Sequence, residues 1–190
     1  MTTEATPETR EPANATLERL RAGLEGLAVR EVEARDGMPT LTIEPADALP
    51  VMTALRDACG FEILTLVTAL DHDPDPPAPR FEMTWQLQSV QHGDRVRVHA
   101  TLAGRGEGTD DAPRVASVVS LWPGAAYGER ECFDMFGVLF EGHENLKRIL
   151  MPEAYDHHPL RKDFPHAGIE PDRLYKAWDR ERRAPQGDGA

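Results

Sequence analysis

The sequence predicts an α+β fold, with helices on one face of a mainly antiparallel mixed sheet and an extended C-terminal arm. Two observations support this prediction. Apolar residues recur at helical spacing in some segments and at every second position in others. The segments of the second kind gather between the predicted helices instead of alternating with them one by one, which is typical of α+β domains.

The length of 190 residues suits one domain with appendages. Residues 1–15 are polar, contain proline and lack periodicity, so we expect a flexible N-terminal tail. We expect the α+β domain to span residues 16–150. Residues 151–190 are rich in histidine, proline and charge, and they predict an extended arm that docks on a partner and has a disordered end.

Three helices are predicted from apolar residues three or four positions apart. The first begins at Thr16, whose hydroxyl suits the N-cap position. The second covers residues 48–59, with Asp47 as its cap. The third covers residues 125–136, and Gly137 follows it where a left-handed residue often ends a helix.

Strands are predicted at residues 29–34, 40–44, 63–70, 81–87 and 96–102. The first two are joined through Asp36-Gly37, a favoured hairpin turn. The unbroken apolar run over 63–70 predicts a strand that is buried on both faces. The next two strands alternate apolar and polar residues, as half-buried strands do. Residues 115–122 are expected to form a short helix before Pro123.

Composition excludes several classes of function. The net charge of −12 argues against nucleic-acid binding and against direct adhesion to an anionic membrane. The two cysteines, Cys59 and Cys132, are far apart and too few for a zinc or iron–sulfur site. The N-terminus lacks the basic and apolar regions of a secretion signal, and the longest apolar run is too short to span a membrane.

Most short motifs that suggest chemistry are explained better as loops. Residues 71–77 contain three acids, but prolines stand where a calcium loop needs glycine, so we expect a solvated loop. The adjacent His157 and His158 point to opposite sides of an extended chain and suit a shared metal poorly. Residues 104–108 are rich in glycine but lack the lysine and hydroxyl of a phosphate-binding loop.

The segment 129–151, ERECFDMFGVLFEGHENLKRILM, is the strongest candidate for function. Its acids could perform acid–base chemistry only with a nearby base, nucleophile or metal, and no such group is apparent. Bulky apolar residues are interleaved with the charges, which favours burial partly in the domain and partly in a partner. The arm repeats this mixture of arginine, lysine and aromatic residues, which is typical of docking surfaces.

These two segments resemble the signature of the 30-kDa subunit of respiratory complex I, known as the C subunit in bacteria. The resemblance is strong over about residues 115–166, fair over 60–103 and weak elsewhere. Tyr127 and Asn145 are small departures from the pattern. The positions that match the signature, or that we expect at the partner interface, are Glu129, Arg130, Glu131, Asp134, Met135, Phe136, Gly137, His143, Lys147, Arg148, Ile149, Leu150, Pro159, Arg161, Lys162, Asp163 and Phe164.

The resemblance implies a structural subunit of the hydrophilic arm of NADH:quinone oxidoreductase, which passes electrons from NADH to quinone. It implies that this chain binds no cofactor or metal and has no catalytic residues, while FMN and iron–sulfur clusters lie in partner subunits. The expected partners are the 49-kDa-type subunit and the subunit with the terminal cluster, close to the quinone site. The expected location is the cytoplasmic side of the bacterial inner membrane, with membrane contact only through the complex.

Three other hypotheses remain open from the sequence. Membrane-bound hydrogenases related to complex I carry a similar domain, so an equivalent subunit there is the main alternative. A free-standing enzyme would need Asp134 or His143 for its reaction, and a binding module would be a stable monomer. For the subunit hypothesis, Arg161→Ala and Lys162→Ala are expected to weaken assembly more than folding.

Overall fold

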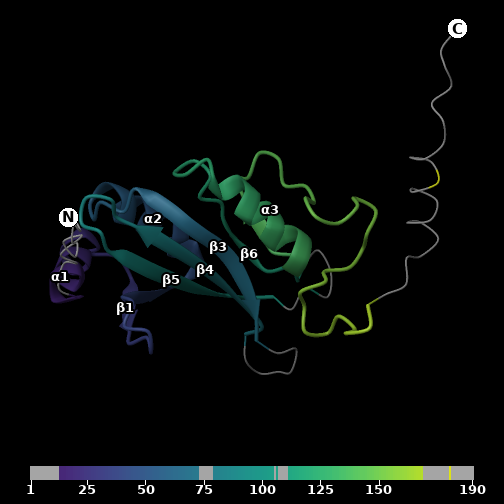
Figure 1. Ribbon diagram of the computed structural model, residues 1–190, viewed down its shortest axis with the longest axis horizontal. Helices are drawn as coiled ribbons and strands as arrows, with labels where there is room; N and C mark the ends of the chain where they lie inside the picture. The colour runs from purple at the N-terminus through teal and green to yellow at the C-terminus, as the bar shows by residue number, and fades with distance from the viewer. Residues whose placement is uncertain (1–12, 73–78, 105, 107–110, 169–179, 181–190) are drawn as a thin grey trace, which may run out of the picture.

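The computed structural model describes residues 13–72, 79–104, 106, 111–168 and 180 (Figure 1). In chain order the elements are α1 (Ala13–Gly23), β1 (Val29–Val32), β2 (Thr40–Ile43), the 3-10 turn η1 (Pro45–Asp47), α2 (Ala48–Asp57), β3 (Ile63–Asp71), β4 (Phe81–Gln88), β5 (Arg95–Leu102), β6 (Arg114–Ala116), α3 (Ala125–Phe136) and β7 (Leu139–Glu141). This is the predicted α+β fold.

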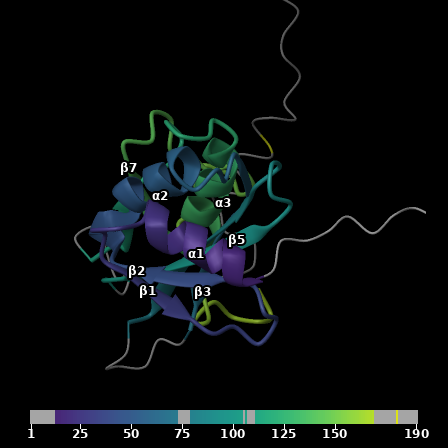
Figure 2. The ribbon, with the colours of Figure 1, turned by 90° about the vertical axis from the view of Figure 1, so that its left-hand side faces the viewer.

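The main sheet has five strands in the order β1-β2-β5-β4-β3. Its pairings are antiparallel except for β2 with β5, which are parallel, so the sheet is mixed as predicted. Strands β6 and β7 form a separate parallel pair. Figure 2 shows that α1, α2 and α3 lie on the same side of the main sheet.

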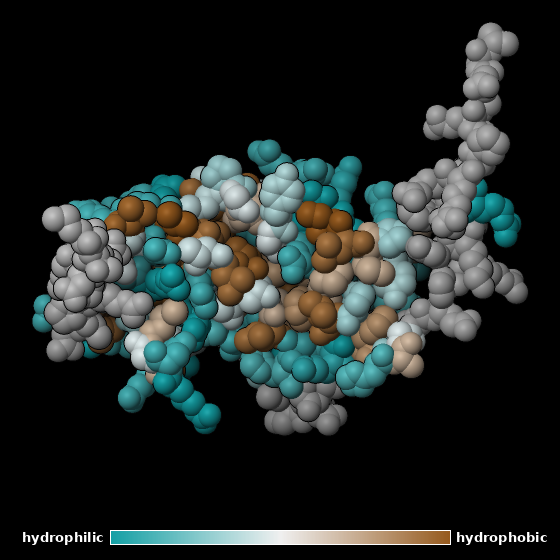
Figure 3. Space-filling model, viewed as in Figure 1, coloured by the Kyte–Doolittle hydropathy of each residue, from teal (hydrophilic) through white to brown (hydrophobic). Residues whose placement is uncertain are grey.

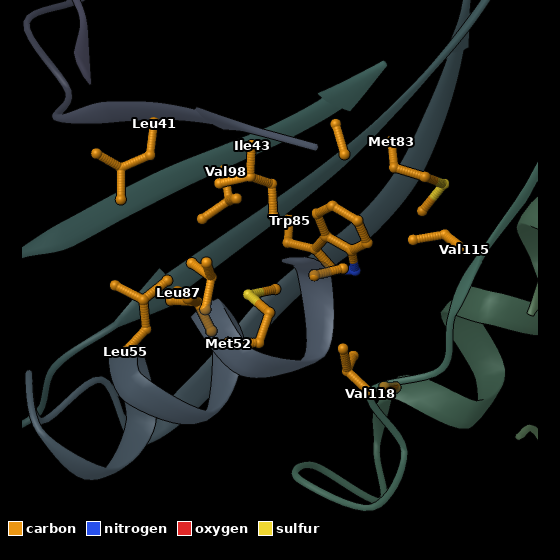
Figure 4. Close-up of a cluster of buried hydrophobic side chains, with 14 of the residues drawn as sticks. Leu41, Ile43, Met52, Leu55, Met83, Trp85, Leu87, Val98, Val115 and Val118 are labelled. Carbon is orange, nitrogen blue, oxygen red and sulfur yellow. The ribbon is translucent and has the colours of Figure 1, made fainter. Parts of the chain in front are cut away.

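The core lies between the helices and the sheet. Every second residue of β4 and β5 points inward, which is the alternation that the sequence predicts. Trp85, Leu87 and Val98 are fully buried there, and they face Met52 and Leu55 of α2 (Figure 4). Burial of this apolar surface is the main stabilising contribution to the fold.

Two predicted helix caps are corrected by the structure. Helix α1 begins at Ala13, so Thr16 lies inside it, and its Oγ1 donates a hydrogen bond to Asp94 Oδ2 at 2.7 Å instead of capping the helix. Asp47 does precede α2, but its side chain makes no capping hydrogen bond. Gly37 has positive φ, as the predicted turn requires, and so does Gly60, which lies just beyond the end of α2.

Strand β3 is not buried on both faces. It is one of the two edge strands of the sheet, and Ile63, Leu66 and Leu70 are each about 40% exposed, at 43%, 40% and 42%. An unbroken apolar run cannot by itself distinguish a central strand from an edge strand, because that depends on pairing with distant segments. Helix α3 covers only the inward face of β3, which it approaches closely at Gly128 and Val67.

The helix expected over residues 115–122 is also wrong. Residues 114–116 form β6, and turns follow it up to α3. The β-branched valines of this segment favour extended backbone. The pairing that stabilises β6 comes from β7, which lies beyond α3 in the sequence. A three-residue strand with a distant partner leaves no periodic pattern that the sequence could reveal.

Candidate functional site

Helix α3 carries the first part of the signature and ends as predicted. Gly137 has φ +79°, and its N–H donates to the carbonyl of Phe133. The buried face of the helix includes Cys132 and Phe136, and the same face carries two acids, Glu129 and Asp134. Both carboxylate side chains are fully buried, so neither belongs to a salt-bridged surface.

Glu129 joins α3 to the segment that follows β6. Its Oε2 accepts a hydrogen bond from Ser117 Oγ at 2.7 Å, and Oε1 accepts one from Val118 N–H at 2.8 Å. Burial raises the pKa of this carboxyl, and the two hydrogen bonds oppose that increase only in part. The carboxylate therefore attaches the segment after β6 to α3 and is not accessible to a substrate.

Asp134 holds the end of the signature. Its Oδ2 accepts hydrogen bonds from the consecutive N–H groups of Ile149, Leu150 and Met151, at 2.9, 2.7 and 2.9 Å. Its Oδ1 lies 2.6 Å from Nη1 of Arg148. Burial would raise the pKa of Asp134, but these donors outweigh it and hold the pKa below its ordinary value.

The chain between β7 and Met151 runs alongside α3. The His143 ring contacts the carbonyl of Ala126, near the start of the helix. Further along this segment, Arg130 donates to the carbonyls of Lys147 and Arg148, just before the three residues that bond to Asp134. The signature polar groups thus attach this segment to the helix through backbone atoms. Glu131 and Lys147 differ from them in being exposed to solvent.

The described part of the arm, residues 151–168, folds back against the domain. Leu160 N–H donates to the carbonyl of Met135, and His158 Nδ1 lies 2.9 Å from the carbonyl of Asp134. Arg161 donates to the carbonyls of Phe136 and Gly106, and burial lowers the pKa of its guanidinium. Arg161 is thus engaged within its own chain.

An ion-pair cluster holds the next residues of the arm. Arg80 forms a two-point contact with Asp71, at 3.0 and 2.8 Å, and reaches Asp163 at 2.9 Å. Asp71 also accepts the N–H of Lys162. The guanidinium groups of Arg80 and Arg161 lie 4.8 and 5.3 Å from the ring centre of Phe81. The two carboxylates offset the repulsion between the two arginines.

Sequence reasoning missed Asp71 and Arg80 as site residues. The sequence predicts that Asp71 lies in a solvated loop, but it ends β3 and is buried; residues 73–77 of that loop lie outside the described residues. The signal was present, because an acid that ends an apolar strand and an arginine just before the next strand bring opposite charges to the same sheet end.

The two acids of the signature are buried, whereas several apolar side chains of the signature and the arm are exposed to solvent. Ile149, Leu150 and Leu160 are 37%, 63% and 52% exposed. Their backbone N–H groups bond to Asp134 and Met135, which places all three beside the C-terminal end of α3. We call these three residues the signature patch. Figure 3 shows apolar side chains gathered next to this end of the helix.

Within the described ranges, no three or more His, Cys, Asp or Glu residues gather in a way that could hold a metal ion. His157 packs edge-on against Tyr155 and Phe164, whereas His158 turns to the end of α3, so the two rings do not converge. Both cysteines are buried, and burial raises their pKa values. None of the described helices combines the length and apolar character needed to cross a membrane.

Several known proteins with similar sequences carry the name of the C subunit of NADH-quinone oxidoreductase. The protein of this name from Thiobacillus denitrificans is 41% identical over 162 residues, which cover 80% of this chain and 78% of the relative. The protein of this name from Rhodobacter capsulatus is 40% identical over 140 residues, covering 74% and 67%.

Solved structures show the same fold. A trypsin-resistant fragment (1-134) of Nqo5 is similar with a TM-score of 0.52 and 28% identity, covering 70% of this chain and 98% of that one. A chain of a membrane-bound sulfane sulfur reductase, an archaeal respiratory membrane complex, has a TM-score of 0.63 at 22% identity, covering 95% and 97%. The family model "Respiratory-chain NADH dehydrogenase, 30 Kd subunit" matches residues 41–170. The chain therefore belongs to the family of the 30-kDa subunit of the respiratory-chain NADH dehydrogenase.

Proposed function

We propose that this chain is a structural subunit of a proton-translocating NADH:quinone oxidoreductase and binds no cofactor of its own. The complex passes electrons from NADH through FMN and iron–sulfur clusters to quinone. In this proposal the chain docks on the 49-kDa-type subunit, near the subunit with the terminal cluster and near the quinone site. It is held on the cytoplasmic side of the bacterial inner membrane through the complex alone.

One observation carries the structural role. Glu129 and Asp134, the buried acids of the signature, both accept hydrogen bonds on each of their two oxygens from donors of their own chain. A general acid or base must reach the proton that it transfers, and these two carboxylates instead face backbone N–H groups together with the Ser117 hydroxyl or the Arg148 guanidinium. Their arrangement supports a role in shaping the surface around α3 rather than a role in a reaction.

The signature patch supports the docking role. Three aliphatic side chains would ordinarily be withdrawn from water, yet Asp134 and the end of α3 hold their backbone in a position that exposes them. The exposed cation of Lys162 follows in the same segment. Apolar anchors next to a charge are typical of surfaces that become buried in a partner.

The first experiment tags the chain in its native cell, solubilises the membranes gently and identifies what co-purifies. We expect a large assembly with flavin, iron–sulfur clusters and quinone-linked NADH oxidation. Nickel with hydrogen-dependent activity would assign the chain to a related hydrogenase instead. A chain that is recovered alone would overturn the proposal and favour a free-standing enzyme or binding module.

A second experiment tests the signature patch. Leu150→Glu places a charge on an anchor, and losing such an anchor typically costs about 2 kcal/mol of binding, roughly thirtyfold in affinity. We expect the assembled fraction to fall accordingly. Val90→Glu is the matched control, because Val90 is 66% exposed and lies at the turn between β4 and β5. Equal assembly of the two variants would contradict docking through this patch.

A further inference from the structure

The main sheet has a second face that the signature does not use. All three helices lie on one side of it, and Figure 2 shows no described helix over the other side. The register of the strands defines that other side, because paired residues share a face. We call it the open face. Leu66, Thr68 and Leu70 of β3 lie on it, opposite Gln86, Thr84 and Glu82 of β4.

The β3 part of the open face is unusually apolar. An antiparallel sheet with one solvated face normally alternates apolar and polar residues, and β4 and β5 do so. Strand β3 places Ile63, Leu66 and Leu70 outward instead, each about 40% exposed, at 43%, 40% and 42%. These three side chains lie on the same face of one strand, so they form an apolar stripe along the edge of the sheet.

The edge itself lacks the usual protection. Exposed edge strands normally carry a charge, a proline or both, which prevents another chain from adding to the sheet. Residues 63–70 of β3, ILTLVTAL, contain neither. Among the described residues, β3 pairs with a strand on one side only. A strand of this composition at a free edge is typical of a surface that is covered in the working assembly.

Across the sheet the open face becomes basic. Its outward positions on β5 include Arg95, Arg97 and His99, and Arg30 follows on β1. Glu82 is the acid that the five strands contribute to this face, and it is engaged by His99 at 2.7 Å. Asp36 of the β1–β2 loop pairs with Arg97. Arg30 and Arg95 are exposed, and their charge has no acid opposite it on the strands.

The whole chain, in contrast, has a net charge of −12. Pairing this basic face with the same face of a second copy would bring like charges together, so its charge favours a partner segment that carries carboxylates. We propose that the open face binds an acidic segment of a neighbouring subunit, with its apolar side chains on Leu66 and Leu70 and its carboxylates toward Arg30 and Arg95. This inference rests on the proposed function, because it requires membership in an assembly.

Thiol protection, read on this chain alone, tests the proposal with low background, because Cys59 and Cys132 are both buried. Leu66→Cys and Val90→Cys variants are each treated with a maleimide, once as full chain and once in the purified complex. Thiol reactivity depends on access, so we expect the complex to slow labelling of the Leu66→Cys variant by about tenfold or more. Labelling of the Val90→Cys control is expected to stay nearly unchanged.

Charge is tested in the same complex. Adding Arg95→Glu to Leu66→Cys is expected to restore fast labelling, because carboxylates of the partner would be repelled. Adding Arg95→Lys keeps the charge and is expected to leave the protection in place. Protection that persists with Arg95→Glu would overturn the acidic nature of the partner.

The remaining outcomes each overturn the proposal in a distinct way. Fast labelling of the Leu66→Cys variant within an intact complex would show that the face is open to solvent, while the proposed function would still stand. Protection in the isolated full chain that disappears when residues 1–12 are deleted would identify the chain's own N-terminus as the occupant. A disulfide between two chains through the introduced thiol would identify a second copy. Failure to co-purify with any complex would instead remove the proposed function.

Discussion

Replacing Asp134 with asparagine separates a structural role of the signature from a chemical one. The carboxylate receives three backbone N–H groups on one oxygen and Arg148 on the other. The amide of Asp134→Asn is neutral and has one oxygen, and its NH2 group would face a donor. The substitution therefore removes an acceptor and also leaves the guanidinium without its counter-charge.

The expected magnitude follows from burial. The side chain of Asp134 is fully buried, and that of Arg148 is 11% exposed. Removing one partner of such a pair typically costs about 3–5 kcal/mol. The free energy of unfolding of an ordinary domain is about 5–15 kcal/mol. The variant should therefore still fold, with a loss of stability that is easy to measure.

Urea unfolding followed by tryptophan fluorescence measures this loss. Glu131→Gln is the control, because Glu131 lies on the same helix, is exposed, and should change the free energy of unfolding by less than about 0.5 kcal/mol. We also expect faster proteolysis near Leu150, whose N–H loses its charged acceptor. A loss below about 1 kcal/mol for Asp134→Asn would refute the idea that this carboxylate organises the segment.

Three further predictions concern neighbouring groups. Burial raises the pKa of Glu129, so its contribution to stability is complete below the unfolded pKa, near about 4.3, and is lost as the pH rises through the folded pKa. The glutamine of Glu129→Gln does not titrate. The free energy of unfolding of the variant relative to the wild type should therefore be higher at pH 8 than at pH 5, which lie several units and about one unit above the unfolded pKa. An equal difference at the two pH values would contradict this. Gly137→Ala and Gly142→Ala both strain a positive φ, but only at Gly137 would the new Cβ collide with Arg161, so the melting temperature should fall further there. Lys162→Ala should leave unfolding unchanged, because its backbone N–H makes the contact with the domain, while co-purification of the complex should weaken; normal yield of the complex would count against a docking role.

The Arg161→Ala variant is a less specific test of assembly than the sequence suggested. The guanidinium of Arg161 bonds to the carbonyls of Phe136 and Gly106 and lies against the ring of Phe81. Its removal leaves two carbonyls without these donors, so both folding and assembly should suffer. Sequence identified Arg161 as a site residue but could not show that its partners lie in its own chain.

Local sequence patterns predict the helices and strands that are determined by interactions between residues close in the sequence. The alternation in β4 and β5, the periodicity of α2 and α3, and the left-handed Gly137 all depend on nearby residues, and the structure confirms them. The position of β3 at the edge and the existence of β6 depend on pairing with distant segments, which no local pattern records. Tertiary context decides such cases.

For the buried acid Glu129, the sequence predicts the position on the helix but not the hydrogen-bond donor. Glu129, Cys132 and Phe136 stand at positions three and seven apart, so helical periodicity places the acid on the apolar face. That signal predicts that Glu129 is unusual. It does not name Ser117 as the donor, because Ser117 precedes α3 in a segment with no regular structure. A donor set assembled from separate segments appears only in three dimensions.

The parallel pairing of β2 with β5 has a consequence for how the chain folds. The β1–β2 hairpin is complete early in synthesis, whereas the strand beside it in the sheet is added only after α2, β3 and β4. An isolated two-stranded hairpin is marginally stable in water, so β2 must wait for a neighbour from much later in the chain. Closing the sheet through such a non-local contact adds loop entropy to the folding barrier and slows folding. On the ribosome, the last step for this sheet should be the insertion of the first hairpin against a meander made after it.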